Sequence, residues 1–338
     1  MPVSAFGIDL GTSNIKIYAK GEEEVFIAKN MIAIEGRDNL FAYGDNAFEM
    51  YEKAPSNIHI SYPLNNGVIA DIKNMQTLIK CFVSDICHGP IRPAEYYVAV
   101  PHDVTEVEQR AFYDLIKDAG LKEKKVMVVK KAIADGLGMD VDVKNSQGVL
   151  VVDVGYETTE ISILSLGGIV LSRLIKMGGL KFDQSIIAAV RKEFNLIIGE
   201  KTAEKVKISL RRLENDKKGA IVYGRDIVRG LPVEREIPTD LIYDCMKENF
   251  SLIVDQIRVI LERTPPELGA DIYRRGIYLT GGASQVSHLD ELIADGTGLK
   301  VNVAENPIAS VSLGLARVIG DPNYQSVAYQ YLSGTGKD

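Results

Sequence analysis

Tryptophan is absent from this sequence, cysteine is scarce, and no long apolar run occurs. Three cysteines among 338 residues argue against a framework of disulfides and fit a reducing cytoplasm. No apolar run approaches the roughly 20 residues that a membrane-spanning helix needs. The first residues show no basic segment followed by an apolar core, so we expect no signal peptide.

Positively charged side chains are fewer than negatively charged ones. Lys and Arg number 39 against 46 Asp and Glu, for a net charge of −7, which argues against nucleic acid as a partner. The hydrophobic content of 46% and the charged content of 25% are typical of soluble globular proteins. With 338 residues, the chain is long enough for two domains with full cores.

Residues 6–18 have the pattern of a β-hairpin. An apolar run ends at Asp9, a Gly-Thr-Ser-Asn turn follows at residues 11–14, and an alternating run comes after it. Gly11 has no Cβ, so backbone N–H groups can approach an anion, and the next three residues add polar donors. A carboxylate at the position of Asp9 can hold a hydrated Mg²⁺ beside phosphates.

The same pattern recurs at residues 149–164. Asp153 ends the second apolar strand, and the turn contains Gly155, Thr158 and Thr159. Either stretch alone could be an ordinary hairpin with a polar turn. Together they indicate two related halves, and we expect a phosphate chain to be clamped between the two turns.

A third glycine turn lies at residues 276–284, where a strand leads through Gly281 and Gly282 into a helix start. The N-terminus of a helix favours the negative charge of a nucleotide. Alone, this turn is weak evidence for a nucleotide site. Because it follows two acidic hairpins in this order, the three turns together are strong evidence.

The order of predicted elements is a three-stranded meander, a helix, a strand and a helix, given twice, so the fold class is α/β with two duplicated lobes. We also expect a capping box at residues 105–108 and helices over about 74–87 and 239–263. The first lobe is expected over 1–140, with its core at 1–34 and 67–140 and an insertion at 35–66. The second is expected over 141–338, with its core at 141–180 and 240–320, an insertion at 181–239 and a C-terminal tail at 321–338.

The three turns resemble, in order and spacing, the phosphate-side elements of the actin superfamily, and within it the MreB/Mbl family of bacterial actins. Ser165–Val170 and Gly199–Glu204 match that family closely, and Thr264–Ile272 is almost specific to it. The resemblance covers about residues 6–319. It implies an actin-like ATPase fold in which each lobe has a mixed sheet flanked by helices.

The resemblance also implies a function. The protein would bind ATP and Mg²⁺ between its lobes and polymerise into paired protofilaments at the inner face of the cell membrane. There it would meet membrane proteins of the cell-wall machinery and guide cell shape. Asp9 and Asp153 would order Mg²⁺ through water, with Asp153 also catalytic. Carried over residue by residue, the nucleotide contacts would be Asp9, Gly11, Thr12, Ser13, Asn14, Gly155, Glu157, Thr158, Thr159, Gly178, Gly179, Glu204, Lys205, Lys207, Ile208, Gly281, Gly282, Ala283, Ser284 and Gln285.

The sequence departs from the family pattern at two positions. The family has Glu-Glu-Pro before the helix near residue 131, and its second glutamate orients the attacking water, whereas this chain has Lys131 there. A cation cannot act as that base. The second turn has Glu157 where the family has a glycine. We therefore expect ATP hydrolysis to be slow or lost, and we expect Lys131 and Glu157 to pair across the cleft.

Membrane attachment has little support in the sequence. Only five residues precede Phe6, too few for an amphipathic helix, and the loop around Ile91 offers one large apolar side chain. Two other functions stay open on this fold. One is a nucleotide-binding adaptor that does not polymerise, and the other is a small-molecule kinase.

Overall fold

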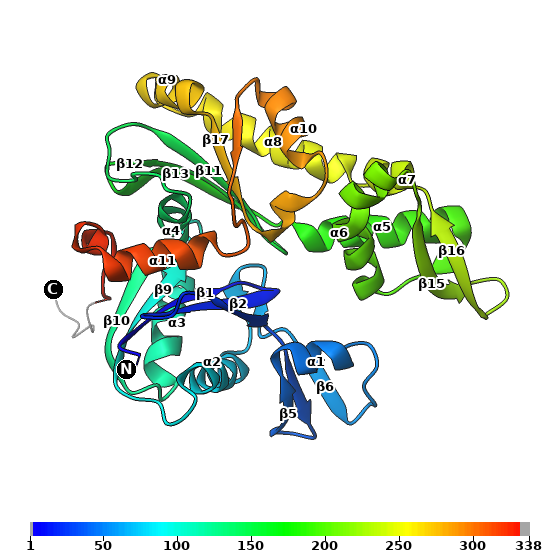
Figure 1. The fold of residues 1–338 in the computed structure, drawn as a ribbon, viewed down its shortest axis with the longest axis horizontal. Coiled ribbons are helices and arrows are strands. Elements are labelled where there is room, and N and C mark those ends of the chain that lie inside the picture. The colour runs from blue at the N-terminus through cyan, green and yellow to red at the C-terminus, as the bar shows by residue number, and fades with distance from the viewer. Residues whose placement is uncertain (1–2, 332–338) are drawn as a thin grey trace.

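The computed structural model describes residues 3–331, which form two stacked α/β lobes, each with a smaller projecting part (Figure 1). Each lobe is built on a five-stranded sheet, ordered β10-β9-β1-β2-β3 in the first lobe and β13-β12-β11-β17-β18 in the second. In both sheets an antiparallel meander of three strands continues into two parallel strands. The duplicated α/β fold expected from the sequence is confirmed.

The central strands β1 and β11 lead into the two acidic turns, and both are buried along their whole length. Their continuous apolar runs are what strands covered on both faces require. The first sheet consists of β1 (Ala5–Leu10), β2 (Asn14–Ala19), β3 (Phe26–Lys29), β9 (Ala94–Val100) and β10 (Glu123–Lys130). The second consists of β11 (Val149–Val154), β12 (Thr159–Ser165), β13 (Gly168–Ile175), β17 (Ile277–Thr280) and β18 (Val301–Val303).

Helices cover both sheets, and two of them lie between the lobes. The helices of the first lobe are α2 (Ile72–Cys87) and α3 (Glu106–Asp118), and those between the lobes are α4 (Lys131–Gly138) and α11 (Ser310–Gly320). The second lobe has α8 (Lys247–Glu262), α9 (Pro266–Arg275), the 3-10 turn η1 (Gly282–Gln285) and α10 (Leu289–Thr297). The capping box is confirmed, because Thr105 and Glu108 each accept a hydrogen bond from the other's backbone N–H. Within residues 3–331, no helix has both the length and the apolar character to cross a membrane.

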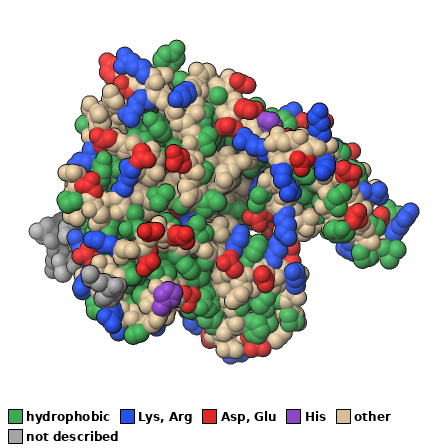
Figure 2. All heavy atoms as spheres, in the orientation of Figure 1, with side chains coloured by type: hydrophobic (Ala, Val, Ile, Leu, Met, Phe, Trp, Pro, Cys, Tyr) green, Lys and Arg blue, Asp and Glu red, His purple; other side chains and the backbone are tan. Residues whose placement is uncertain are grey.

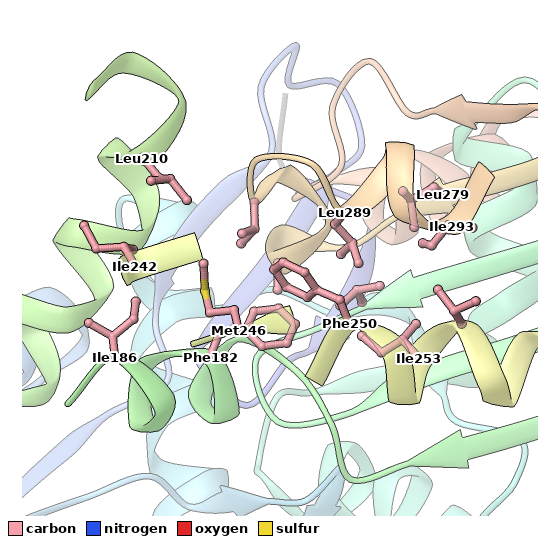
Figure 3. Close-up of a cluster of buried hydrophobic side chains, with 14 of the residues drawn as sticks. Phe182, Ile186, Leu210, Ile242, Met246, Phe250, Ile253, Leu279, Leu289 and Ile293 are labelled. Carbon is pink, nitrogen blue, oxygen red and sulfur yellow. The ribbon is translucent and has the colours of Figure 1, made fainter. Parts of the chain in front are cut away.

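Three large apolar clusters hold this arrangement together. One lies under α2 and α3 in the first lobe. A second fills the other lobe, where Phe182, Met246 and Phe250 pack side by side (Figure 3). The third joins the lobes, because it combines residues of both sheets, such as Val129 and Val151, with residues of α4 and α11.

We call the two projecting parts the first and second insertion (Figure 1). Their elements reach beyond the expected bounds of 35–66 and 181–239, because β4 begins at Ile32, α5 begins at Gly179 and α7 ends at Asp244. The first contains β4 (Ile32–Glu35), β5 (Asn39–Tyr43), α1 (Gly44–Met50) and β6 (Ile58–Ser61), and is followed by the short pair β7 (Leu64–Asn65) and β8 (Val68–Ile69). The second contains α5 (Gly179–Phe194), β14 (Leu196–Ile197), α6 (Glu200–Asp216), β15 (Ala220–Asp226), β16 (Pro232–Ile237) and α7 (Thr239–Asp244).

The expectation of one helix over residues 239–263 is wrong. The chain turns at Cys245 and Met246, so that α7 and α8 are separate. Met246 at this turn is fully buried beside Phe182 and Phe250. The break lets α7 pack on α6 while α8 covers the sheet of the second lobe.

The tail expected at 321–338 is described only as far as residue 331, and residues 332–338 lie outside the described residues. Its first part forms the 3-10 segment η2 (Pro322–Val327). Tyr329 then pairs with Val128 of β10, so this part of the chain returns to the first lobe. The boundary between the lobes at residue 140 stays a prediction.

Candidate functional site

The two acidic turns lie on opposite walls of one cavity of about 980 Å³ between the lobes. The surface is hollowed near the centre of the molecule in Figure 2. Asp9 and Asp153 both line the cavity and are almost fully buried. The two hairpins bring them there because each aspartate comes near the end of a central strand, just before the turn.

Most of the residues expected at the site line this cavity. From the first lobe and α4 these are Asp9, Gly11, Thr12, Ser13, Asn14 and Lys131. From the second lobe they are Asp153, Gly155, Thr158, Gly179, Glu204, Lys207, Ile208, Gly281, Gly282, Ala283, Ser284 and Gln285.

Four expected residues do not line the cavity: Glu157, Thr159, Gly178 and Lys205. The hydroxyl of Thr159 is buried and donates to the carbonyl of Met177 at 2.8 Å. Gly178 is the N-cap of α5. Lys205 is exposed on α6, because it falls outside the helix face formed by positions three and four residues apart.

That face of α6 forms one wall of the cavity. It carries Glu204, Lys207, Ile208, Arg211, Arg212 and Asn215. The last three were not expected from the sequence, although their spacing on a helix would have indicated them. The buried ammonium of Lys207 donates to the carbonyl of Gly179 at 3.0 Å and forms an ion pair with Asp183 at 2.9 Å.

The third turn packs directly on the second. Gly281 has a φ of +90°, and a Cβ at this position would lie 2.2 Å from Oδ1 of Asp153. Only glycine fits this conformation and this close approach. The glycine in the sequence therefore places the start of η1 beside the acidic turn.

Each acidic turn has a lysine partner. Lys16 lies opposite Asp9 in the register of β1 and β2, and its Nζ is 2.9 Å from Oδ2 of Asp9. At the second turn the cation comes from α4, because Nζ of Lys131 lies 2.6 Å from Oδ2 of Asp153. Residues opposite each other in an antiparallel pair project to the same face, so register alone could have indicated Lys16.

The expected pairing of Lys131 with Glu157 is wrong. Lys131 pairs with Asp153, whereas the carboxylate of Glu157 accepts a hydrogen bond from the backbone N–H of Asn66 at 2.5 Å. Glu157 lies in the turn beyond the strand and reaches the loop between β7 and β8 on the first lobe. It joins the lobes at the edge of the cleft instead of neutralising Lys131.

Two further buried carboxyl groups line the cavity, and neither was expected from the sequence. Asp135 lies one turn after Lys131 on α4, and Glu160 lies opposite Asp153 in the register of β11 and β12. Both are nearly fully buried, and Oδ2 of Asp135 and Oε2 of Glu160 have no hydrogen-bond partner.

Burial shifts the pKa values of the ionisable groups that line the cavity. Burial raises the pKa of Glu160 to about 7. Burial and then the charge of Asp153 raise the pKa of Asp135 well above its usual value. Burial alone would lower the pKa of Lys131, but the surrounding carboxylates, Asp153 first, raise it above its usual value. Lys131 is therefore protonated at neutral pH, and Asp135 and Glu160 are carboxyl groups that hold protons at higher pH than usual.

Contacts across the mouth of the cleft join the first insertion and β3 to α6. Nζ of Lys29 lies 3.6 Å from the carboxylate of Glu204. The ring of Phe48 lies between two ammonium groups, 4.3 Å from that of Lys29 and 4.4 Å from that of Lys201. The hydroxyl of Tyr51 donates to Glu200 at 3.3 Å. These contacts hold the two lobes around the cavity.

Known proteins are similar to this chain over most of its length. The family model described as "MreB/Mbl protein" matches residues 3–326. The cell shape-determining protein Mbl of Bacillus subtilis (strain 168) is 36% identical over 312 residues, which are 91% of this chain and 93% of Mbl. The cell shape-determining protein MreB of Escherichia coli (strain K12) is 34% identical over 316 residues, 91% of this chain and 90% of MreB.

A solved relative has the same fold. MreB5 of Spiroplasma citri, 33% identical to this chain, was crystallised with ADP and with AMPPNP, and its TM-scores are 0.84 and 0.86. The ADP structure covers 94% of this chain and 98% of MreB5, and the AMPPNP structure covers 95% and 97%. The fold, the order of the three turns and these matches agree, and the chain belongs to the MreB/Mbl family.

Proposed function

We propose that this chain is a bacterial actin-like cytoskeletal protein that binds ATP between its lobes and polymerises into filaments that guide cell shape and cell-wall synthesis. The observation that carries the proposal is the shared cavity, with an acidic, glycine-bearing turn on each wall and a third glycine turn beside them. Its volume of about 980 Å³ lies at the upper end of the usual range for small-molecule sites, about 300–1,000 Å³. Nucleotides bound to the relative MreB5 support the same assignment.

The phosphates would lie between the turns at residues 11–14 and 155–158, where backbone N–H groups and hydroxyls converge. The adenosine would lie between the inner face of α6 and the start of η1. The family resemblance implies Mg²⁺ ordered through water by Asp9 and Asp153. These residues fit the ion only in part, because one oxygen of each carboxylate is already paired with a lysine.

Hydrolysis is slow or lost in this proposal. The position that would orient the attacking water holds Lys131, whose ammonium is paired with Asp153. It cannot accept a proton from water, and the removal of a general base commonly costs about 10²–10⁴-fold in rate.

Sedimentation and negative-stain electron microscopy with ATP, with ADP and without nucleotide test the proposal. We expect nucleotide binding and pelletable filaments. Nucleotide binding without filaments under any condition would instead support the non-polymerising adaptor. Failure to bind nucleotide at all would overturn the proposal.

Membrane association and contact with membrane proteins of the cell-wall machinery belong to the same proposal. Ile91 of the candidate loop is half-buried and packs against the core of the first lobe. It therefore exposes less than the whole side chain, whose full burial is worth about 2–3 kcal/mol. We propose that single subunits bind lipid poorly and that filaments bind through many repeats.

A further inference from the structure

We propose that the ammonium of Lys131 is a tethered cation that takes the electrostatic place of a divalent metal in the cleft, so that nucleotide binding depends little on Mg²⁺. The inference rests on the proposed nucleotide site. The positive charge in question belongs to a side chain of the protein and not to a bound ion.

The surroundings of Lys131 are those of a bound cation. Its Nζ lies 2.6 Å from Asp153, and the carboxyl groups of Asp9, Asp135 and Glu160 line the same cavity. The lysine is the first residue of α4, where the backbone is held by the core between the lobes. The ammonium is thus fixed among carboxyl groups, as a metal ion would be.

The duplicated hairpins explain why a cation is needed at this point. Asp9 has Lys16 as its cross-strand neighbour, but the matching neighbour of Asp153 is Glu160. The second hairpin therefore places two carboxyl groups side by side, and Asp135 on α4 adds a third. Lys131 is the cation that forms an ion pair with Asp153 in this cluster, and without it these carboxyl groups would repel a polyphosphate more strongly.

A divalent ion fits this arrangement poorly. Both carboxylates that the family resemblance assigns to the metal already share an oxygen with an ammonium, Asp9 with Lys16 and Asp153 with Lys131. A metal ion beside them would experience repulsion from both lysines. The ammonium groups can donate hydrogen bonds to phosphate oxygens, and their positive charge attracts the phosphates. They can therefore supply the attraction that a metal would otherwise provide.

The test is the affinity for a fluorescent ATP analogue, measured by anisotropy in excess Mg²⁺ and in excess EDTA. For the unmodified protein we expect the two dissociation constants to agree within about threefold, which is less than 1 kcal/mol. Lys131→Met keeps the length of the side chain and removes its charge. We expect its affinity in EDTA to fall at least about tenfold and to be restored by Mg²⁺.

Two variants serve as controls. Lys131→Arg keeps the cation and should keep binding in EDTA. Lys20→Met removes an exposed lysine outside the cavity and should behave as the unmodified protein. Circular dichroism of each variant shows whether it is folded. If Lys131→Met is unfolded, the affinities of the unmodified and Lys131→Arg proteins in EDTA still test whether binding needs Mg²⁺.

The outcomes are separable. Binding by the unmodified protein only in Mg²⁺ would overturn the inference and leave the proposed function standing. Equal binding of folded Lys131→Met in both buffers would show that this lysine does not replace the metal. No binding in either buffer would overturn the proposed function itself and the inference with it.

Discussion

Glu160 and Asp153 face each other across two strands, and both side chains lie inside the cleft. A carboxylate that is buried beside another one costs free energy unless it takes up a proton or acquires a cation. The chain uses both solutions, because Lys131 pairs with Asp153 and the pKa of Glu160 is raised to about 7 by burial. Single residues thus set the charge of the site.

Stability should depend on the protonation of Glu160. Its pKa is about 7 in the folded chain against an ordinary 4.5, so between these values the folded state binds more protons than the unfolded state. The free energy of unfolding should therefore fall as pH rises from about 4.5 to 7. Asp183, whose pKa burial raises to about 6, and Asp135 act in the same direction.

Urea unfolding at pH 5 and at pH 7.5 measures this decline in the free energy of unfolding. Glu160→Gln keeps an oxygen that can accept from the backbone N–H of His102 and should show a shallower decline. The same pH dependence in both proteins would count against a raised pKa at Glu160.

Lys131→Glu should raise the release of phosphate from ATP in the presence of Mg²⁺, by at least about tenfold, because it restores a carboxylate where the family orients water. Asp135 lies one turn away, so the double variant with Asp135→Asn avoids placing a further charge among the carboxyl groups. A malachite green assay over hours measures the rate, with Lys20→Glu as control. Rapid turnover by the unmodified protein would refute the idea that hydrolysis is slow.

At the scale of elements, the site depends on how turns and helices approach one another. The start of η1 touches the end of β11 through Gly281, and the face of α6 is joined to the first insertion through Phe48. Both contacts link segments that are far apart in the sequence. Each can be tested with a matched control.

Gly281→Ala should destabilise the protein and weaken nucleotide binding. The positive φ alone costs about 1 kcal/mol, and the new Cβ would collide with Oδ1 of Asp153 at 2.2 Å. Gly298→Ala is the control for a positive φ without a clash, because its φ is +68° and no atom lies within 4 Å of the added Cβ. Its ψ of 16° differs from the 150° of Gly281, so part of a larger loss at Gly281 would come from the backbone. Guanidinium unfolding should show a larger loss for Gly281→Ala, and equal losses would show that the contact with Asp153 is unimportant.

Phe48→Ala should loosen the closure of the cleft. The ring lies between the ammonium groups of Lys29 and Lys201, and each such contact contributes about 0.5–1 kcal/mol at exposed sites. Hydrogen exchange of α1 and α6 should become faster. Phe41→Ala removes a half-exposed ring from β5 in the same insertion, and a similar change there would mean that general destabilisation is responsible.

At the scale of the whole molecule, the two lobes share an apolar core at one side of the cleft and polar contacts at its mouth. Polar contacts near the surface, such as these partly buried ones, are individually weak, whereas the shared core is continuous. We expect opening and closing to occur at the mouth. Nucleotide state and assembly would then be coupled through the same motion.

Lipid binding should depend on assembly. The candidate loop offers part of one isoleucine, so a single subunit should sediment poorly with liposomes, whereas a filament repeats the contact many times. Co-sedimentation with anionic vesicles, with and without nucleotide, measures this. Ile91→Ser should reduce the filament-bound fraction if this loop is the contact, and an unchanged fraction would point to another surface.

The sequence by itself determined the duplicated α/β fold and most of the residues around the cleft, because turns, glycines and alternating runs act locally along the chain. The inner face of α6 beyond residue 208 and the carboxyl groups of Asp135 and Glu160 also follow simple periodicities, but nothing local shows that they face a cavity. The break between α7 and α8 depended on where Met246 is buried. The tertiary structure alone decided that Lys131 pairs with Asp153 and that Glu157 reaches Asn66, because charge pairing depends on distances between segments far apart in the chain.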